Sequence, residues 1–173
     1  LAACGASESN EGVSSPAVVK KRKRLIMVTT WPKGLPGLGM AAERIAEEVE
    51  KLTDGSISIR VQAAGELVPA FQAFDAVRDG TAHMYHGAEY YWKAKSSAFP
   101  FFTAVPFGMT AQEIMGWIDF GGGQQLWDEL SGQHGIKAFQ AANTGHQMGG
   151  WFNKEINSLD DFNGLKMRIP GQG

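Results

Sequence analysis

The sequence predicts an α/β fold with a largely parallel sheet and flanking helices. Short apolar runs rich in β-branched residues alternate along the chain with stretches whose apolar residues recur at helical spacing. Loops rich in glycine and proline separate these stretches. Strands separated by helices in this rhythm form right-handed βαβ units, whose strands are parallel and covered on both faces. With 173 residues, the chain has room for one domain, or for one lobe and part of another.

The first two strands and the helix between them have the clearest patterns. Residues 25–30 are an apolar run of buried-strand type, and residues 56–62 alternate apolar and polar side chains. A loop over residues 31–39 leads into a helix that Gly55 ends. The apolar positions of this helix recur at helical spacing and are Leu38, Ala41, Ala42, Ile45, Ala46, Val49 and Leu52.

A second helix and a third strand are predicted next. Pro69 suits the first turn of the helix, which stops at Asp79 and Gly80. Residues 82–86 are the candidate strand. The helical residues expected to point inward are Phe71, Phe74 and Val77.

The later part of the chain contains short helices and further strand-like runs. Residues 110–113 form a capping box that opens a helix to Phe120, and another short helix covers residues 124–130. Residues 158–161 cap a single helical turn that Gly164 closes. Three more strands are predicted over residues 136–141, 147–152 and 165–169.

The first residues predict export. Leu1-Ala2-Ala3-Cys4 has the form of a bacterial lipobox, so we interpret residues 1–3 as the tail of a signal peptide and Cys4 as a lipidation site. Cys4 is the only cysteine, so no disulfide framework accompanies export. The polar segment to residue 24 is predicted to be a disordered tether. Its basic run, residues 20–24, is either a solvated charge run or a contact to anionic headgroups.

Composition and motifs argue against several classes of protein. A formal net charge of -2 does not suit a nucleic-acid surface, and no stretch is apolar and long enough to span a bilayer. His83 and His86 suggest a metal pair, but no third ligand stands at a convincing spacing. The sequence has neither a Gly-x-Ser-x-Gly elbow nor a Cys-His arrangement, and nothing in it indicates a catalytic base.

A glycine loop leaves one enzymatic alternative open. Gly34, Gly37 and Gly39 lie between a strand and a helix, where a dinucleotide fingerprint would sit, and Glu66 follows the next strand. The spacing differs from G-x-G-x-x-G, and Pro36 interrupts it. Because the glycines still lie at the right place between strand and helix, a nucleotide-dependent oxidoreductase that uses this loop is the alternative function.

Polar groups near the end of the chain suit an anion. Asn143, Thr144, Gln147 and Arg168 lie on or beside predicted strands, and a guanidinium with nearby amides pairs well with a carboxylate. Periodicity alone favours a solvated Arg168, because Leu165, Met167 and Ile169 would form the buried face. The aromatic run at residues 89–92 is either core or the wall of a ligand site.

Several segments together resemble the solute-binding proteins of the tripartite ATP-independent (TRAP) transporters, in particular the branch that binds alpha-keto and alpha-hydroxy acids. The resemblance begins near Leu25, and its most specific part is Gly164-Leu165-Lys166-Met167-Arg168, in step with Asn143-Thr144-Gly145-His146-Gln147. The segments that resemble the family are residues 31–39, 65–69, 87–92, 143–152 and 159–171.

This resemblance implies a periplasmic protein that is not an enzyme and has no catalytic cofactor. It would capture a small 2-oxo or 2-hydroxy monocarboxylate between two α/β lobes and deliver it to the membrane permease subunits. Residues 25–139 would form the first lobe, and residues 140–173 would begin a second lobe that is incomplete here.

The family also implies roles for individual residues. Arg168 would form the salt bridge to the substrate carboxylate, and Asn143 would donate a hydrogen bond to the ligand. Gln147 would contact the ligand or a bound sodium or calcium ion. Tyr90 and Tyr91 would help to wall the cleft.

Overall fold

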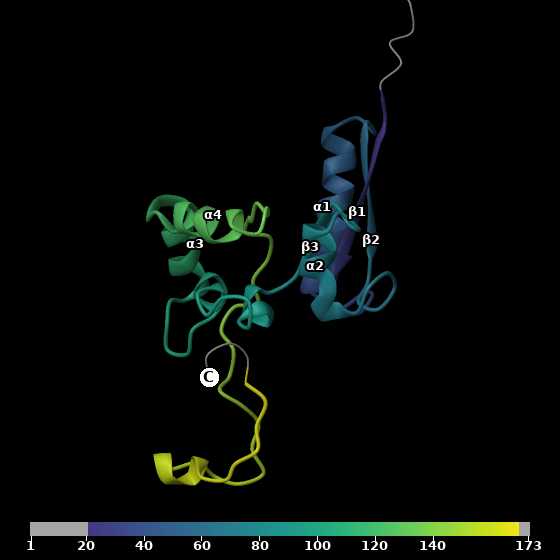
Figure 1. Ribbon diagram of the computed structural model, residues 1–173. Coiled ribbons are helices and arrows are strands. Elements are labelled where there is room, and N and C mark those ends of the chain that lie inside the picture. Colours follow the sequence, from purple (N-terminus) through teal and green to yellow (C-terminus); the bar gives the residue numbers. More distant parts are fainter. Residues whose placement is uncertain (1–20, 170–173) are drawn as a thin grey trace, which may run out of the picture.

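The structure, a computed structural model, describes residues 21–169. Its sheet has three parallel strands, and parallel pairing is what the sequence predicts; their order is β2-β1-β3 (Figure 1). The central strand β1 spans Lys23–Thr29, β2 spans Ile57–Gln62, and β3 spans Met84–His86. Cys4 and most of the predicted tether lie outside the described residues.

Helices cover both faces of the central strand. Val28 and Thr29 are both buried, although successive residues of a strand point to opposite faces. Val28 belongs to a core with residues of α2 (Ala73–Arg78). Thr29 lines a pocket together with Gly39 of α1 (Leu38–Leu52), so α1 lies on the other face.

The sequence places Phe74 correctly and Phe71 wrongly. Phe74 is fully buried at the centre of the core, where its ring lies 5.4 Å from that of Trp92 and 5.6 Å from that of Phe99. Phe71 is 63% exposed. It lies in a separate 3₁₀ turn, η1 (Ala70–Gln72), so it does not share the buried face of α2 and packs on Tyr91 instead.

A second group of helices follows the sheet. Two 3₁₀ turns, η2 (Glu89–Trp92) and η3 (Phe99–Phe102), lead to α3 (Ala111–Phe120) and α4 (Gly123–Gly132). The predicted capping box is present at the start of α3. Trp117 and Trp127 both stack on Phe102 in a second apolar core. No helix within residues 21–169 has the length and hydropathy needed to cross a membrane.

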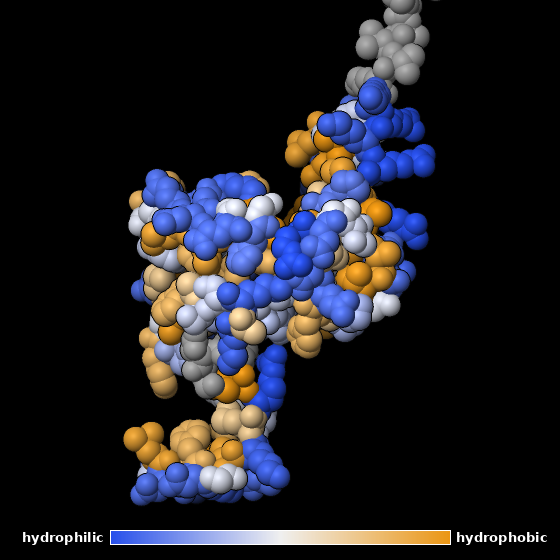
Figure 2. All heavy atoms as spheres, in the orientation of Figure 1, coloured by the Kyte–Doolittle hydropathy of each residue, from blue (hydrophilic) through white to orange (hydrophobic). Residues whose placement is uncertain are grey.

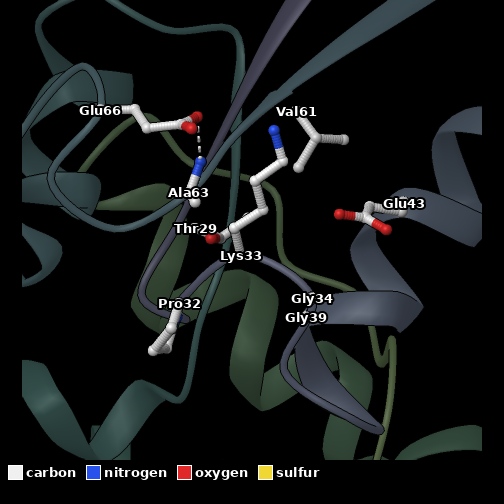
Figure 3. A pocket seen from close by; sticks show the side chains of 9 residues that line it. All are labelled: Thr29, Pro32, Lys33, Gly34, Gly39, Glu43, Val61, Ala63 and Glu66. Carbon is white, nitrogen blue, oxygen red and sulfur yellow. Dashed lines mark hydrogen bonds between the residues drawn. The ribbon is translucent and has the colours of Figure 1, made fainter.

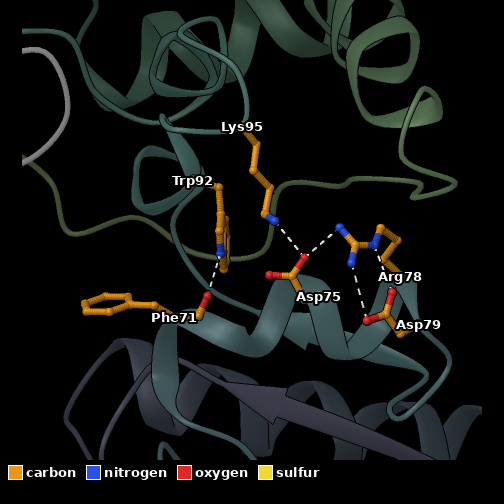
Figure 4. Close-up of polar contacts among 6 residues, drawn as sticks. All are labelled: Phe71, Asp75, Arg78, Asp79, Trp92 and Lys95. Carbon is orange, nitrogen blue, oxygen red and sulfur yellow. Dashed lines mark hydrogen bonds and ion pairs between the residues drawn. The ribbon is translucent and has the colours of Figure 1, made fainter.

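Polar contacts attach the segment after β3 to α2 (Figure 4). Lys95 Nζ lies 2.6 Å from Asp75 Oδ1, which also lies 2.8 Å from a terminal guanidinium nitrogen of Arg78. The indole N–H of Trp92 donates to the carbonyl oxygen of Phe71 at 3.0 Å. These contacts place η2 beside the turn that carries Phe71.

The three later strands predicted from the sequence are absent. Residues 136–141, 147–152 and 165–169 are not assigned to any strand, because no neighbouring strand in the described part of the chain supplies ladder hydrogen bonds. The C-terminal arm, which we define as residues 140–169, contains a single 3₁₀ turn, η4 (Leu159–Phe162). The predicted capping box of this turn is present, with Ser158 and Asp161 as its two members.

Candidate ligand-binding site

The structure brings Arg168 next to Tyr90, although the two residues are far apart in the sequence. Burial, followed by the neighbouring Tyr91, raises the pKa of Tyr90 to about 12, whereas the charge and hydrogen bonding of Arg168 act in the opposite direction. The guanidinium therefore lies near the Tyr90 side chain. Arg168 is itself exposed, so an anion can reach its guanidinium from solvent.

Tyr90 belongs to an aromatic wall, which we define as Trp31, Phe71, Tyr90 and Tyr91. The ring of Tyr91 is central, with its centroid 4.7 Å from that of Tyr90, 5.0 Å from Phe71 and 6.1 Å from Trp31. The predicted aromatic run therefore divides between two roles. Trp92 and Glu89 turn into the core, whereas Tyr90 and Tyr91 form the wall beside Arg168.

Asn143 and Gln147 lie on the C-terminal arm and make local contacts. The Asn143 side chain accepts a hydrogen bond from the amide of Gly145 at 3.1 Å, and its nitrogen lies 3.9 Å from the sulfur of Met115. Gln147 donates to the Thr144 hydroxyl at 3.0 Å. Neither amide side chain is hydrogen-bonded to Arg168 among the contacts of residues 21–169.

The two histidines have structural partners. His83 Nδ1 accepts a hydrogen bond from the amide of Ile26 at 3.1 Å, and His86 Nδ1 accepts one from the indole of Trp31 at 2.7 Å. In the part of the chain that the structure describes, no group of three or more His, Cys, Asp or Glu residues is arranged to hold a metal ion.

The glycine loop borders a pocket that is too small for a nucleotide (Figure 3). Its cavity volume is about 30 Å³, enough for a water molecule or an ion. Glu66, which would have to meet a ribose, instead accepts a hydrogen bond from the amide of Ala63 at 2.8 Å. The lining residues are Thr29, Pro32, Lys33, Gly34, Gly39, Glu43, Val61, Ala63 and Glu66.

Glu89 is a buried acid that sequence reasoning did not single out. Only 5% of it is exposed, and its Oε1 accepts a hydrogen bond from the Tyr85 hydroxyl at 2.9 Å. Burial raises the pKa of Glu89 to about 7, although Tyr85 and the indole of Trp127 lower it. The Trp127 contact lacks the geometry of a formed hydrogen bond, so both the indole N–H and Oε2 of Glu89 remain unpaired.

Replacing Glu89 by glutamine is expected to flatten the pH dependence of stability. Because the folded-state pKa of about 7 exceeds the ordinary value of 4.5, wild-type stability falls as the pH rises from 4.5 through 7. The loss is on the order of 3 kcal/mol, at about 1.4 kcal/mol per pKa unit. Urea unfolding of the full-length wild type and of Glu89→Gln, each at pH 5 and pH 8, measures this change in the free energy of unfolding. If wild type and Glu89→Gln differ in stability by the same amount at both pH values, the raised pKa of Glu89 is contradicted.

Residues 27–173 match the DctP family, described as bacterial extracellular solute-binding protein, family 7. A curated relative, the monocarboxylate 2-oxoacid-binding periplasmic protein all3028 of Nostoc sp., is 47% identical over 147 residues. The match covers 85% of this chain and 40% of that relative.

Solved TRAP solute-binding proteins are also similar to this chain. The TRAP periplasmic solute-binding protein from Pseudoalteromonas atlantica, with bound sodium and pyruvate, is 46% identical with a TM-score of 0.84. The one from Colwellia psychrerythraea, with bound calcium and pyruvate, is 44% identical with a TM-score of 0.85. Each match covers 87% of this chain and 46% of the solved chain. The chain therefore spans less than half the length of these relatives.

Proposed function

Since this chain belongs to the DctP family of bacterial extracellular solute-binding proteins, we propose that it forms the first half of a TRAP transporter solute-binding protein. The protein captures a small 2-oxo or 2-hydroxy monocarboxylate and delivers it to the membrane permease. The family match over residues 27–173 carries this proposal, and the effect of Arg168 on the pKa of Tyr90 supports it.

The chemistry of this arrangement suits a small carboxylic acid. A carboxylate taken out of water needs a paired charge and hydrogen-bond donors, which a guanidinium supplies in a bidentate geometry. Tyr90 and Tyr91 offer apolar surface to the short carbon chain of the acid. Asn143 would donate a hydrogen bond to the ligand, and Gln147 would contact the ligand or a cation.

We assign residues 25–139 to the first lobe and residues 140–173 to the start of the second. The C-terminal arm supports this division, because it leaves the body of the molecule with apolar side chains exposed (Figure 2). Trp151 is 89% exposed and Leu159 is 87% exposed. Closure of a second lobe would cover these groups and carry Asn143 and Gln147 toward the first lobe, as in other hinged binding proteins.

A sodium or calcium ion is part of this proposal. The related proteins of Pseudoalteromonas atlantica and Colwellia psychrerythraea hold sodium and calcium, respectively, together with pyruvate. An amide oxygen such as Oε1 of Gln147 is a suitable ligand for either hard cation. The protein is a carrier in this scheme and needs no catalytic base or catalytic cofactor.

Cys4 is expected to be lipidated after export, because Leu1-Ala2-Ala3-Cys4 precedes a polar segment. The anchor would hold the protein at the membrane on the periplasmic side. Mass spectrometry of the protein from its bacterial host tests this. An unmodified Cys4, or cleavage at another site, would refute the anchor.

A calorimetric titration of the full-length protein tests the function. Pyruvate, lactate and branched 2-oxo acids are expected to bind, and NAD is not. Binding of NAD without any acid would favour the oxidoreductase alternative at the loop of Gly34, Gly37 and Gly39. The small cavity beside that loop supports the carrier instead.

A further inference from the structure

Trp31 is fixed to the ends of all three strands of the sheet. It follows the last residue of β1 by two positions, and only 7% of it is exposed. Its carbonyl oxygen accepts a hydrogen bond from the amide of Ala64, just after β2, at 2.9 Å. Its indole N–H donates to Nδ1 of His86, the last residue of β3, at 2.7 Å. Backbone and ring are thus both anchored at the carboxyl edge of the sheet.

His86 is suited to hold the indole in one orientation. An indole N–H only donates, so Nδ1 of His86 must be unprotonated to accept from it. Burial lowers the pKa of His86 and so favours the neutral ring. The two rings also meet edge to face, with centroids 6.3 Å apart and an interplanar angle of 71°. Rotation of the Trp31 ring would break both contacts.

The ring of Trp31 contacts the aromatic wall on the way to Arg168. Trp31 meets Tyr91 at 6.1 Å between ring centroids, and Tyr91 meets Tyr90 at 4.7 Å. The charge of Arg168 lowers the pKa of Tyr90, so these two side chains lie near each other. Ring contacts therefore lead from the end of β3 to Tyr90, near the arginine that we propose binds the carboxylate.

We infer that Trp31, held by His86, is a positioning residue for the carboxylate site. It sets the ring of Tyr91 and, through it, the ring of Tyr90 in the aromatic wall. Packed aromatic side chains have preferred geometries and interiors transmit small displacements, so a Trp31 ring released from His86 would shift the wall. This inference rests on the proposed function, because it assigns a role within the same binding site.

Two substitutions in the full-length protein test the inference. Trp31→Phe removes the donor, and His86→Leu removes the acceptor. Each is expected to weaken pyruvate binding about tenfold, the equivalent of one hydrogen bond of about 1.4 kcal/mol. The double variant should bind no more weakly than either single variant, because both changes remove the same contact.

A rescue and a control separate positioning from general destabilisation. His86→Asn keeps an acceptor oxygen and is expected to bind pyruvate within about threefold of wild type. Trp117→Phe makes the same ring truncation in the second core and should lower the unfolding temperature while leaving pyruvate affinity unchanged.

The outcomes distinguish the inference from the function on which it rests. If wild type, Trp31→Phe and His86→Leu all bind pyruvate equally well, the positioning role of Trp31 is overturned but the proposed function stands. A loss in His86→Asn as large as in His86→Leu would also overturn it, because lost packing would then explain the effect. Wild type that binds none of the acids would instead overturn the proposed function.

Discussion

Replacing Arg168 by alanine in the full-length protein is expected to weaken pyruvate binding by about 2 to 5 kcal/mol, which removes measurable affinity. The variant leaves the ligand carboxylate buried without its paired charge, and that penalty exceeds the loss of a solvated contact. Isothermal titration calorimetry measures the change. Tyr90 offers a second readout, because its pKa should rise once the guanidinium that lowers it is gone.

Two further variants separate the geometry of Arg168 from its charge and provide a control. Arg168→Lys keeps the charge but not the bidentate fork, so it should retain only a weak remnant of binding. Lys166→Ala removes an exposed positive charge two residues earlier and should leave affinity unchanged. Unchanged pyruvate affinity in Arg168→Ala would return the residue to the solvated role that its sequence periodicity favours.

The first half of the fold was predictable because its patterns are local and its partners lie nearby in sequence. The apolar run in β1, the alternation in β2 and the helical spacing in α1 each match the observed element closely. These three elements form a βαβ unit in which β1 pairs with β2 in parallel. The predicted capping boxes at Thr110 and Ser158 also succeed, since a cap depends on residues three positions apart.

The prediction of the later strands was wrong for a physical reason. Alternation in residues 165–169 indicates which side chains would share a face, but a strand also needs neighbours that complete its hydrogen bonds. In residues 21–169 these segments have no such neighbours. Related proteins are more than twice as long as the matched region, and we expect their remaining length to supply the missing strands.

The candidate site was only partly accessible to sequence reasoning. Periodicity favoured a solvated Arg168, and the residue is exposed; only the family resemblance assigned it to one site with Tyr90 and Tyr91. The hydrogen bond from Trp31 to His86 joins the ends of two strands, so no local spacing reveals it. Glu89 was hidden for a similar reason, since its burial depends on Tyr85 and Trp127 from separate elements.

A cation bound at Gln147 is expected to strengthen ligand binding. Gln147 uses its side-chain nitrogen for Thr144, and among the described hydrogen bonds its Oε1 accepts none. That oxygen is thus available to a sodium or calcium ion that ties a second ligand oxygen to the protein. Removing both cations from the full-length protein is expected to weaken pyruvate binding at least about tenfold, because a ligand-bridging charge is lost.

The cation and Gln147 should act as one unit. Gln147→Ala is expected to weaken binding in the presence of sodium or calcium, and to add little once the cations are removed, because the two changes delete the same interaction. Gln140→Ala, an exposed glutamine on the same arm, is the matched control and should bind normally. If neither cation removal nor Gln147→Ala changes pyruvate affinity, then Arg168 and Asn143 hold the acid without a bridging metal.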